Sequence, residues 1–185
     1  MATVANKEYP EAIVVQVDTR EQYPIVFPAN VRIPHPSQVH KSCLVKVHTE
    51  KKKLEAGDYC LAGFDSLCII ERKASALELY KNLFHVKDKA RQGRALTKLV
   101  AGTEFPYLMI EASPKELLDC KLPNDTDPEL LIGKIAGMVA RYGLRLLWLP
   151  RRNTLSGRRS MGLVLTHIML GHLLDRYYNT KPKLI

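Results

Sequence analysis

Three charged residues, Glu71, Arg72 and Lys73, directly follow the apolar run Leu-Cys-Ile-Ile. Because side chains alternate along a β-strand, Glu71 and Lys73 would point to one face of a sheet and Arg72 to the other. Asp58 lies upstream within Gly-Asp-Tyr, and a turn at residues 63–65 predicts a hairpin that would bring it beside Glu71. The sequence therefore predicts two carboxylates and an ammonium group at one end of a buried strand.

These groups suit the metal-assisted hydrolysis of a phosphodiester. Carboxylates bind hard divalent cations such as Mg²⁺ or Mn²⁺, and Mg²⁺ keeps several of its waters. The cation polarises the phosphate and lowers the pKa of a bound water. A lysine can position the attacking water and stabilise the developing negative charge. The same pattern also occurs at strand ends that only face solvent, so by itself it leaves both interpretations open.

A second apolar run ends in a similar way. Residues 12–18, Ala-Ile-Val-Val-Gln-Val-Asp, predict a largely buried strand that ends in Asp18 and is followed by Arg20 and Glu21. Two strands of one sheet that end in the same charged pattern favour a shared site over two unrelated turns.

Together, the three motifs resemble the nuclease domain of XPF-type structure-specific endonucleases, within the restriction-endonuclease-like, PD-(D/E)xK fold. The matching segments are Val-Asp-Thr-Arg-Glu at 17–21, Gly-Asp-Tyr at 57–59 and Ile-Glu-Arg-Lys at 70–73, in the family's order. Leu-Met-Ile-Glu at 108–111 is similar to the family's next core strand. The motifs span residues 13–73, and a looser likeness continues to about residue 150 and beyond.

The resemblance implies a role for each charged residue. Asp58 and Glu71 would be metal ligands, with the backbone carbonyl of Arg72 as a third. Asp18 would complete the acidic cluster, directly or through water, and Lys73 would be the catalytic lysine.

Arg20, Glu21 and Arg72 correspond to a supporting shell that holds the acids in place, although plain structural salt bridges are an equally good interpretation. The family often has an aspartate where this chain has Leu77. The adjacent Glu78 is explained more simply as the partner of an N-cap serine, so we leave it out of the site.

The function implied is that of a Mg²⁺- or Mn²⁺-dependent endonuclease that hydrolyses DNA, with branched or flapped DNA as the substrate. The products would carry a 5′-phosphate and a 3′-hydroxyl. Two alternatives stay open: a catalytically silent DNA-binding or scaffold domain of the same fold, and an RNA-directed nuclease.

The charge balance agrees with a polyanionic partner. The chain has 28 Lys and Arg against 19 Asp and Glu, a formal net charge of +9, and basic surfaces attract nucleic acid. Each basic cluster alone is more often a solvated surface, but together they fit binding to a phosphate backbone. The candidate DNA-binding residues are Lys51, Lys52, Lys53, Arg91, Arg94, Arg151 and Arg152.

The elements that must position these residues alternate late in the chain between strand and helix, which predicts an α/β fold with a mixed central sheet flanked by helices. A proline-rich loop follows the first strand. We expect further strands at 43–48, 54–61, 66–73, 107–112 and 144–149, and helices at 76–85, 88–101, 128–143 and 154–178, with a short capped helix starting at 113.

Length and composition predict one domain over residues 1–178 and a loose tail at 179–185. With 185 residues, 46% apolar and 25% charged, the chain has the composition of a globular protein. Its N-terminus lacks the apolar core of a secretory signal, and no run nears the roughly 20 residues of a membrane span. We therefore expect a soluble intracellular protein whose four cysteines are free thiols.

The last expected helix is apolar over much of its circumference. It could form the inner face of the core, which we favour, or the seam of a homodimer.

Overall fold

A seven-stranded mixed sheet forms the centre of the molecule, with strand order β2-β3-β1-β4-β5-β6-β7. The computed structural model describes residues 9–35, 38, 40–150 and 154–177. The strands are β1 (Ala12–Asp18), β2 (Asn30–Pro34), β3 (Ser42–Lys52), β4 (Tyr59–Leu61), β5 (Cys68–Lys73), β6 (Phe105–Ile110) and β7 (Arg145–Trp148). The helices are α1 (Ala76–Phe84), α2 (Val86–Gly102), α3 (Pro114–Leu118), α4 (Pro128–Tyr142) and α5 (Leu155–Tyr177), with a 3₁₀ turn at Pro123–Asp125.

Strand direction explains why charged residues from distant segments meet. β1 runs parallel to β3 and antiparallel to β4, β4 is antiparallel to β5, and β5, β6 and β7 are parallel. The carboxyl ends of β1, β3, β5, β6 and β7 therefore lie at one edge of the sheet, and β4 starts there. Open α/β sheets bind their ligands at this edge.

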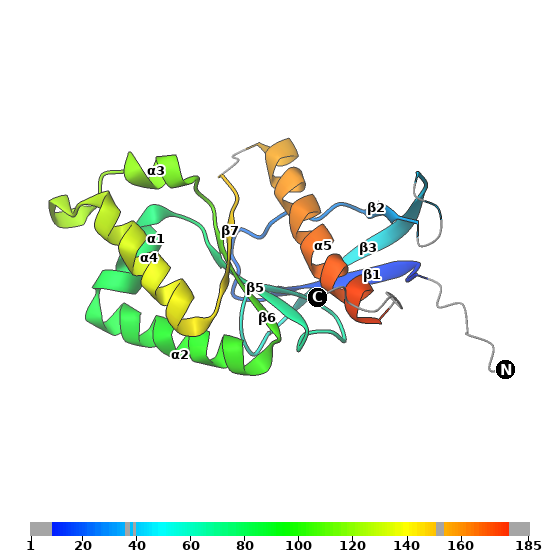
Figure 1. The fold of residues 1–185 in the computed structure, drawn as a ribbon, viewed down its shortest axis with the longest axis horizontal. Helices are drawn as coiled ribbons and strands as arrows, with labels where there is room; N and C mark the ends of the chain where they lie inside the picture. The colour runs from blue at the N-terminus through cyan, green and yellow to red at the C-terminus, as the bar shows by residue number, and fades with distance from the viewer. Residues whose placement is uncertain (1–8, 36–37, 39, 151–153, 178–185) are drawn as a thin grey trace.

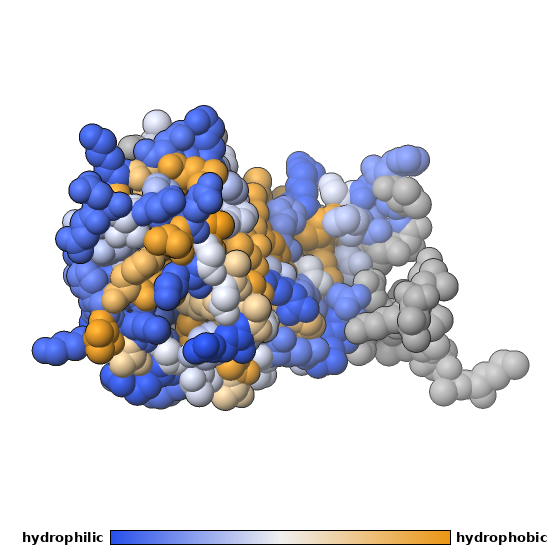
Figure 2. Space-filling model, turned by 60° about the vertical axis from the view of Figure 1, so that its left-hand side comes forward, coloured by the Kyte–Doolittle hydropathy of each residue, from blue (hydrophilic) through white to orange (hydrophobic). Residues whose placement is uncertain are grey.

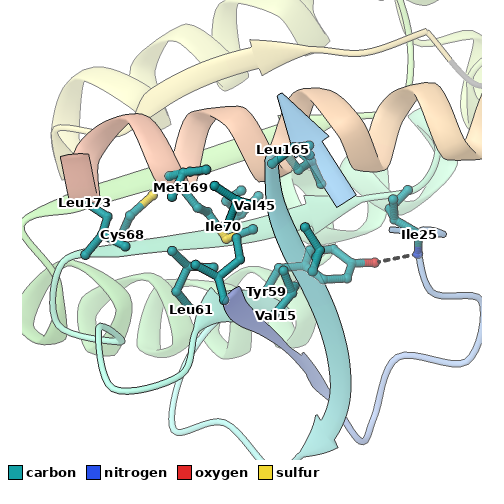
Figure 3. Close-up of a cluster of buried hydrophobic side chains, with 14 of the residues drawn as sticks. Val15, Ile25, Val45, Tyr59, Leu61, Cys68, Ile70, Leu165, Met169 and Leu173 are labelled. Atoms are coloured by element: carbon teal, nitrogen blue, oxygen red, sulfur yellow. Dashed lines mark hydrogen bonds between the residues drawn. The ribbon is translucent and has the colours of Figure 1, made fainter. Parts of the chain in front are cut away.

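Helix α5 covers one face of the sheet (Figure 1). Its buried side chains pack on apolar residues of the central strands, and the hydroxyl of Tyr59 accepts a hydrogen bond from the backbone N–H of Ile25 at 3.1 Å. Helix α5 also contacts the segment before β2. This contact is so close that a Cβ on Gly162 of α5 would lie 2.2 Å from the carbonyl oxygen of Val26. Figure 3 labels Val15, Val45, Tyr59, Leu61, Cys68 and Ile70 of the sheet with Leu165, Met169 and Leu173 of α5.

Helices α1, α2 and α4 pack on the opposite face, over the half of the sheet that contains β4–β7 (Figure 1). Leu79 of α1, Leu96 of α2 and Ile135 of α4 are buried there against Leu108 of β6. The fold is thus a three-layer α/β arrangement with one apolar core on each side of the sheet.

Most of the expected elements are confirmed, with two differences. β2 forms inside the stretch expected to be a proline-rich loop: Val31 and Ile33 are buried in alternation, and Pro34 is tolerated because β2 is an edge strand. The strand expected at 54–61 is reduced to Tyr59–Leu61, because Gly57 has a φ of +70° and turns the chain.

Helix α5 buries Met161, Leu165, Met169, Leu170 and Leu173, so it is the inner face of the core that we favoured. The tail expected at 179–185 lies outside the described residues. No helix of the described chain is long and apolar enough to span a bilayer, and Cys43, Cys60, Cys68 and Cys120 are free thiols.

Candidate active site

Asp58, Glu71 and Lys73 line one cleft of about 470 Å³ at the carboxyl edge of the sheet, as the sequence predicted. Glu71 and Lys73 share the face of β5 that α1 and α2 cover, and Asp58 immediately precedes β4. Helix α2 forms the opposite wall. The remaining lining residues include the cations Arg20, Arg91, Arg94 and Lys98 and the acids Glu55 and Glu78.

Backbone contacts alone already fix the position of Asp58. A Cβ at Gly57 would lie 2.2 Å from Cγ2 of Ile69, so only glycine fits this positive-φ turn against β5. The backbone N–H of Asp58 then donates to the carbonyl of Ile70 at 2.9 Å. The backbone N–H of Arg72 in turn donates to Oδ2 of Asp58 at 2.7 Å, which holds the carboxylate beside β5.

The carboxylates of Asp58 and Glu71 repel each other. Burial and the negative charge of Glu71 raise the pKa of Asp58 to about 8, and the hydrogen bond from the Arg72 backbone opposes this shift only in part. A cation between Asp58 and Glu71 would offset the repulsion between the two carboxylates.

Lys73 is 5% exposed and carries its charge into this acidic environment. Its Nζ donates to Oε1 of Glu71 at 2.7 Å and to Oε1 of Gln92 at 3.0 Å, and Oε1 of Glu78 lies 3.5 Å away. Burial would lower the pKa of Lys73, but the carboxylates of Glu71 and Glu78 outweigh it and the pKa is raised. Lys73 is therefore a fixed cation near neutral pH.

Gln92 and Glu78 belong to this arrangement, although the sequence did not indicate them. Glu78 does have the helix-capping contact expected of it, since its N–H donates to the side chain of Ser75 at 3.1 Å. Its carboxylate also faces Lys73. The sequence did not indicate this contact, because the capping pattern already accounted for Glu78. Gln92 lies on α2, and only the packing of that helix on the sheet brings it to Lys73.

Asp18 takes a different place from the one expected. It is fully buried, and both of its carboxylate oxygens accept hydrogen bonds, from the Arg20 side chain at 2.6 and 2.9 Å and from the Leu54 N–H at 2.8 Å. Burial would raise the pKa of Asp18, but these bonds outweigh it and the pKa is lowered. The geometry therefore does not support Asp18 as a direct metal ligand. It anchors Arg20, which lines the cleft.

Arg72 forms the supporting shell on the other face of β5. Its guanidinium donates to Oε1 of Glu21 and to Oε1 of Glu111, both at 2.8 Å. All three side chains are largely buried. Burial would lower the pKa of Arg72, but the hydrogen bond to Glu111 and the nearby negative charges outweigh it and the pKa is raised. This agrees with the structural interpretation of Glu21 and Arg72. Glu111, the residue that follows β6, is a partner that we had not assigned.

The acids of the cleft match the chemistry of Mg²⁺. Within the described part of the chain, no group of three or more His, Cys, Asp or Glu side chains is arranged to hold a metal ion. Mg²⁺ usually needs only one or two carboxylates, because waters complete its octahedral shell. The hydrogen bonds use Oδ2 of Asp58 and Oε1 of Glu71, which leaves Oδ1 and Oε2 for a cation.

The candidate DNA-binding residues fall into three groups. Arg91 and Arg94 line the cleft from α2. Lys51 and Lys52 end β3 at the same edge of the sheet, and the exposed Lys53 follows them, all outside the cleft lining. Arg151 and Arg152 lie outside the described residues.

A mixed sheet flanked by helices on both faces, with two acids and a lysine gathered at one edge, is the arrangement of the restriction-endonuclease-like class of fold. Within this class the chain has the fold of an XPF-type nuclease domain. XPF from Aeropyrum pernix superposes with a TM-score of 0.54 at 22% identity, covering 93% of this chain and 69% of that chain. The same protein in complex with DNA gives a TM-score of 0.55 at 22% identity, covering 92% and 68%. No family model and no curated protein matches the sequence.

Proposed function

We propose that this chain is a divalent-metal-dependent endonuclease that hydrolyses DNA. The observation that carries the proposal is the convergence of Asp58, Glu71 and Lys73 on one cleft whose other wall is basic. The fold is shared with an XPF protein for which a DNA complex is known, and the net charge of +9 favours a polyanionic ligand.

Each residue of the cleft has a distinct task in this proposal. Asp58 and Glu71 are the residues that would hold a Mg²⁺ or Mn²⁺ ion, since each uses one carboxylate oxygen in the hydrogen bonds described above. When bound, such an ion polarises the scissile phosphate and lowers the pKa of a coordinated water. Lys73 stays protonated, so it orients the attacking water and stabilises negative charge on the phosphate instead of accepting a proton.

The cations of the cleft act on the DNA backbone. Arg91 and Arg94 line the cleft from α2, and guanidinium groups bind phosphate oxygens in a bidentate manner. Arg20 also lines the cleft and adds positive charge, while its Nε and Nη2 stay bound to Asp18. Branched or flapped DNA is the proposed substrate, on the basis of the motifs shared with structure-specific endonucleases. The products carry a 5′-phosphate and a 3′-hydroxyl.

A cleavage panel tests the proposal. Labelled single-stranded, duplex, flap, fork and four-way DNA, and matched RNA, are incubated with the chain in Mg²⁺, in Mn²⁺ and in EDTA. We expect metal-dependent cutting of DNA, strongest on the branched forms. Equal or faster cutting of RNA would identify an RNA-directed nuclease. Binding of DNA without cutting in any metal would identify a silent DNA-binding domain.

A homodimer through α5 is a separate part of the proposal. The outward side of α5 carries Leu163 and Val164, which are 40% and 38% exposed. Light scattering at several concentrations distinguishes a dimer from a monomer.

A further inference from the structure

A second hollow of about 650 Å³ lies beside the cleft, between α1, α2 and α4. Asn82 and Gln92 line both spaces, so they form a common wall between them. On the helical side of the molecule, apolar side chains are exposed between hydrophilic ones (Figure 2). We call this hollow the helical groove.

The helical groove is lined by cations and apolar groups. Lys89, Lys134 and Arg141 contribute positive charge, and no Asp or Glu is among its described lining residues. Its apolar surface includes the aromatic rings of Phe84 and Tyr142. A ligand that combines an anionic group with a flat, largely apolar body matches such a lining in charge and shape.

One of the aromatic rings is already paired with a cation. Nζ of Lys134 lies 5.7 Å from the centre of the Phe84 ring, and Tyr80 stacks on this ring at 4.8 Å. A flat ligand that enters the groove can take the place of the flexible lysine beside Phe84, and the displaced ammonium group is then free to pair with a phosphate.

The common wall contains an unsatisfied hydrogen-bond donor. Gln92 is 7% exposed, its Oε1 accepts from Lys73, and its Nε2 is one of two buried polar side-chain atoms in the described chain without a partner. Buried donors without a partner are rare in native proteins. An acceptor on a ligand at this wall would satisfy Nε2, on the same side chain that orients Lys73.

We propose that the helical groove binds an unpaired nucleotide of the DNA strand that enters the cleft. The inference rests on the proposed DNA-cleaving function, because the shared wall at Asn82 and Gln92 places the two spaces next to each other. The base lies against Phe84 and Tyr142, and the adjoining phosphates face Lys134 and Arg141. The chain thereby selects DNA with unpaired nucleotides next to the cleaved bond.

Gly137 and Gly171 provide a matched pair of variants. A Cβ at either position meets nothing within 4 Å, and both residues are exposed on helices. Gly137 lines the groove, whereas Gly171 lies on α5. Gly137→Phe therefore fills the groove without a backbone clash. Gly171→Phe makes the same change on α5, outside the groove lining. Both changes replace glycine by a better helix former, so neither is expected to unfold its helix.

Fluorescence anisotropy in EDTA, where no cleavage is expected, compares a blunt DNA duplex with the same duplex carrying a short single-stranded dT overhang. We expect Gly137→Phe to weaken binding of the overhang DNA about tenfold, the size of one lost stacking contact, and binding of the blunt duplex less than about twofold. Lys134→Gln should act in the same direction, while Gly171→Phe and Lys121→Gln should leave both affinities unchanged.

Two outcomes would overturn the inference: equal affinity of Gly137→Phe and the parent for overhang DNA, or an equal loss for both DNAs. Cleavage in Mg²⁺ is measured in parallel with the parent chain. If the parent cuts DNA but Gly137→Phe binds overhang DNA normally, only the groove assignment fails. If the parent never cuts but Gly137→Phe selectively loses overhang binding, only the nuclease function fails.

Discussion

Arg20 holds both carboxylate oxygens of Asp18 through Nε and Nη2, at 2.6 and 2.9 Å, although only one residue separates them in the chain. The side chain of Asp18 is completely buried, whereas that of Arg20 is 63% exposed and lines the cleft. A buried acid thus orients a cation at the edge of the site. Asp18 thus supports the site, as Glu21 does through Arg72, whereas Asp58 and Glu71 face the cleft.

Neutralising Asp58 or Glu71 should strongly slow cleavage. We expect Asp58→Asn and Glu71→Gln each to lower kcat by at least about 10²-fold, because each removes a charged ligand of the proposed cation. Quantitative cleavage of a flap substrate under single-turnover conditions measures the effect. Glu55→Gln is the matched control, since Glu55 lines the same cleft but is not among the partners of Lys73 described above. A loss with Glu55→Gln as large as with Glu71→Gln would contradict the assignment.

Lys73 should act as a cation at every accessible pH. Since the pKa of Lys73 is raised above its ordinary value, we expect no loss of its charge as the pH rises from about 6 to 9. Lys73→Met should lower kcat by about 10²-fold with a smaller change in KM. A pH–rate profile of the parent that depends on a deprotonated Lys73 near neutral pH would oppose this role.

Gln92 should matter through the orientation of Lys73. Gln92→Leu removes the acceptor at 3.0 Å from the ammonium group and leaves the charge in place. We expect kcat to fall about tenfold with KM nearly unchanged, and Gln92→Glu to restore part of the rate because it keeps the acceptor. If Gln92→Leu and Gln92→Glu lose the same fraction of kcat, the hydrogen bond to Lys73 has no positioning role.

Removing Arg20 should destabilise the fold through Asp18. Arg20→Ala leaves the buried carboxylate of Asp18 with two backbone N–H donors, those of residue 20 and Leu54, but without its charged partner, and we expect the free energy of unfolding to fall by about 2 kcal/mol. Urea denaturation at neutral pH measures this change. Arg91→Ala is the control: Arg91 pairs with Asp88 at the surface, so its loss should cost less than about 1 kcal/mol.

The same pair has a defined pH dependence. The pKa of Asp18 is lower in the folded chain than its ordinary value of 3.8, so the folded state favours the ionised form. Its contribution to stability is present above the unfolded pKa and is lost as the pH falls through the folded pKa. The difference between the parent and Asp18→Asn should therefore shrink in acid. A difference that stays constant down to about pH 2 would argue against the ionised pair.

The contribution of Asp58 to the free energy of unfolding should have the opposite pH dependence, and a bound metal ion should reverse it. The Asp58 pKa of about 8 exceeds the ordinary aspartate value of 3.8, so in EDTA this group lowers the free energy of unfolding as the pH rises between these values. Mg²⁺ binds the ionised carboxylate, so the rise in Tm caused by Mg²⁺ should be larger at about pH 8 than at about pH 6. Asp58→Asn should remove most of this pH dependence, and a Tm rise independent of pH in the parent would contradict it.

The fit of α5 against the rest of the core can be tested at one position. Gly162→Ala places a Cβ 2.2 Å from the carbonyl oxygen of Val26, and we expect a loss of at least about 2 kcal/mol in the free energy of unfolding. Gly171→Ala on the same helix meets nothing within 4 Å and should be neutral or stabilising, because alanine is the better helix former. Thermal unfolding followed by circular dichroism compares the two variants.

The resemblance of the three charged motifs to XPF-type nuclease domains, together with the order of strands and helices, predicted the class of fold. The alternation of side chains along a strand and the turn at residues 63–65 predicted that Asp58, Glu71 and Lys73 meet. Edge strand β2 escaped prediction because its apolar residues, Val31 and Ile33, are few and stand among prolines. The shortened β4 depends on the close approach of Gly57 to Ile69, which links separate segments.

What only the tertiary structure decided is which charges pair. In the sequence, Asp18 and Asp58 looked equivalent, because each is an acid at the end of a strand: Asp18 ends β1 and Asp58 precedes β4. Burial beside Arg20 removes Asp18 from the cleft, whereas burial and the approach of Glu71 raise the pKa of Asp58 at the cleft. Gln92 reaches Lys73 from a helix nineteen residues further along the chain. Pairing energies depend on distances and on exclusion of water, and both are set by packing between segments that lie far apart in the sequence.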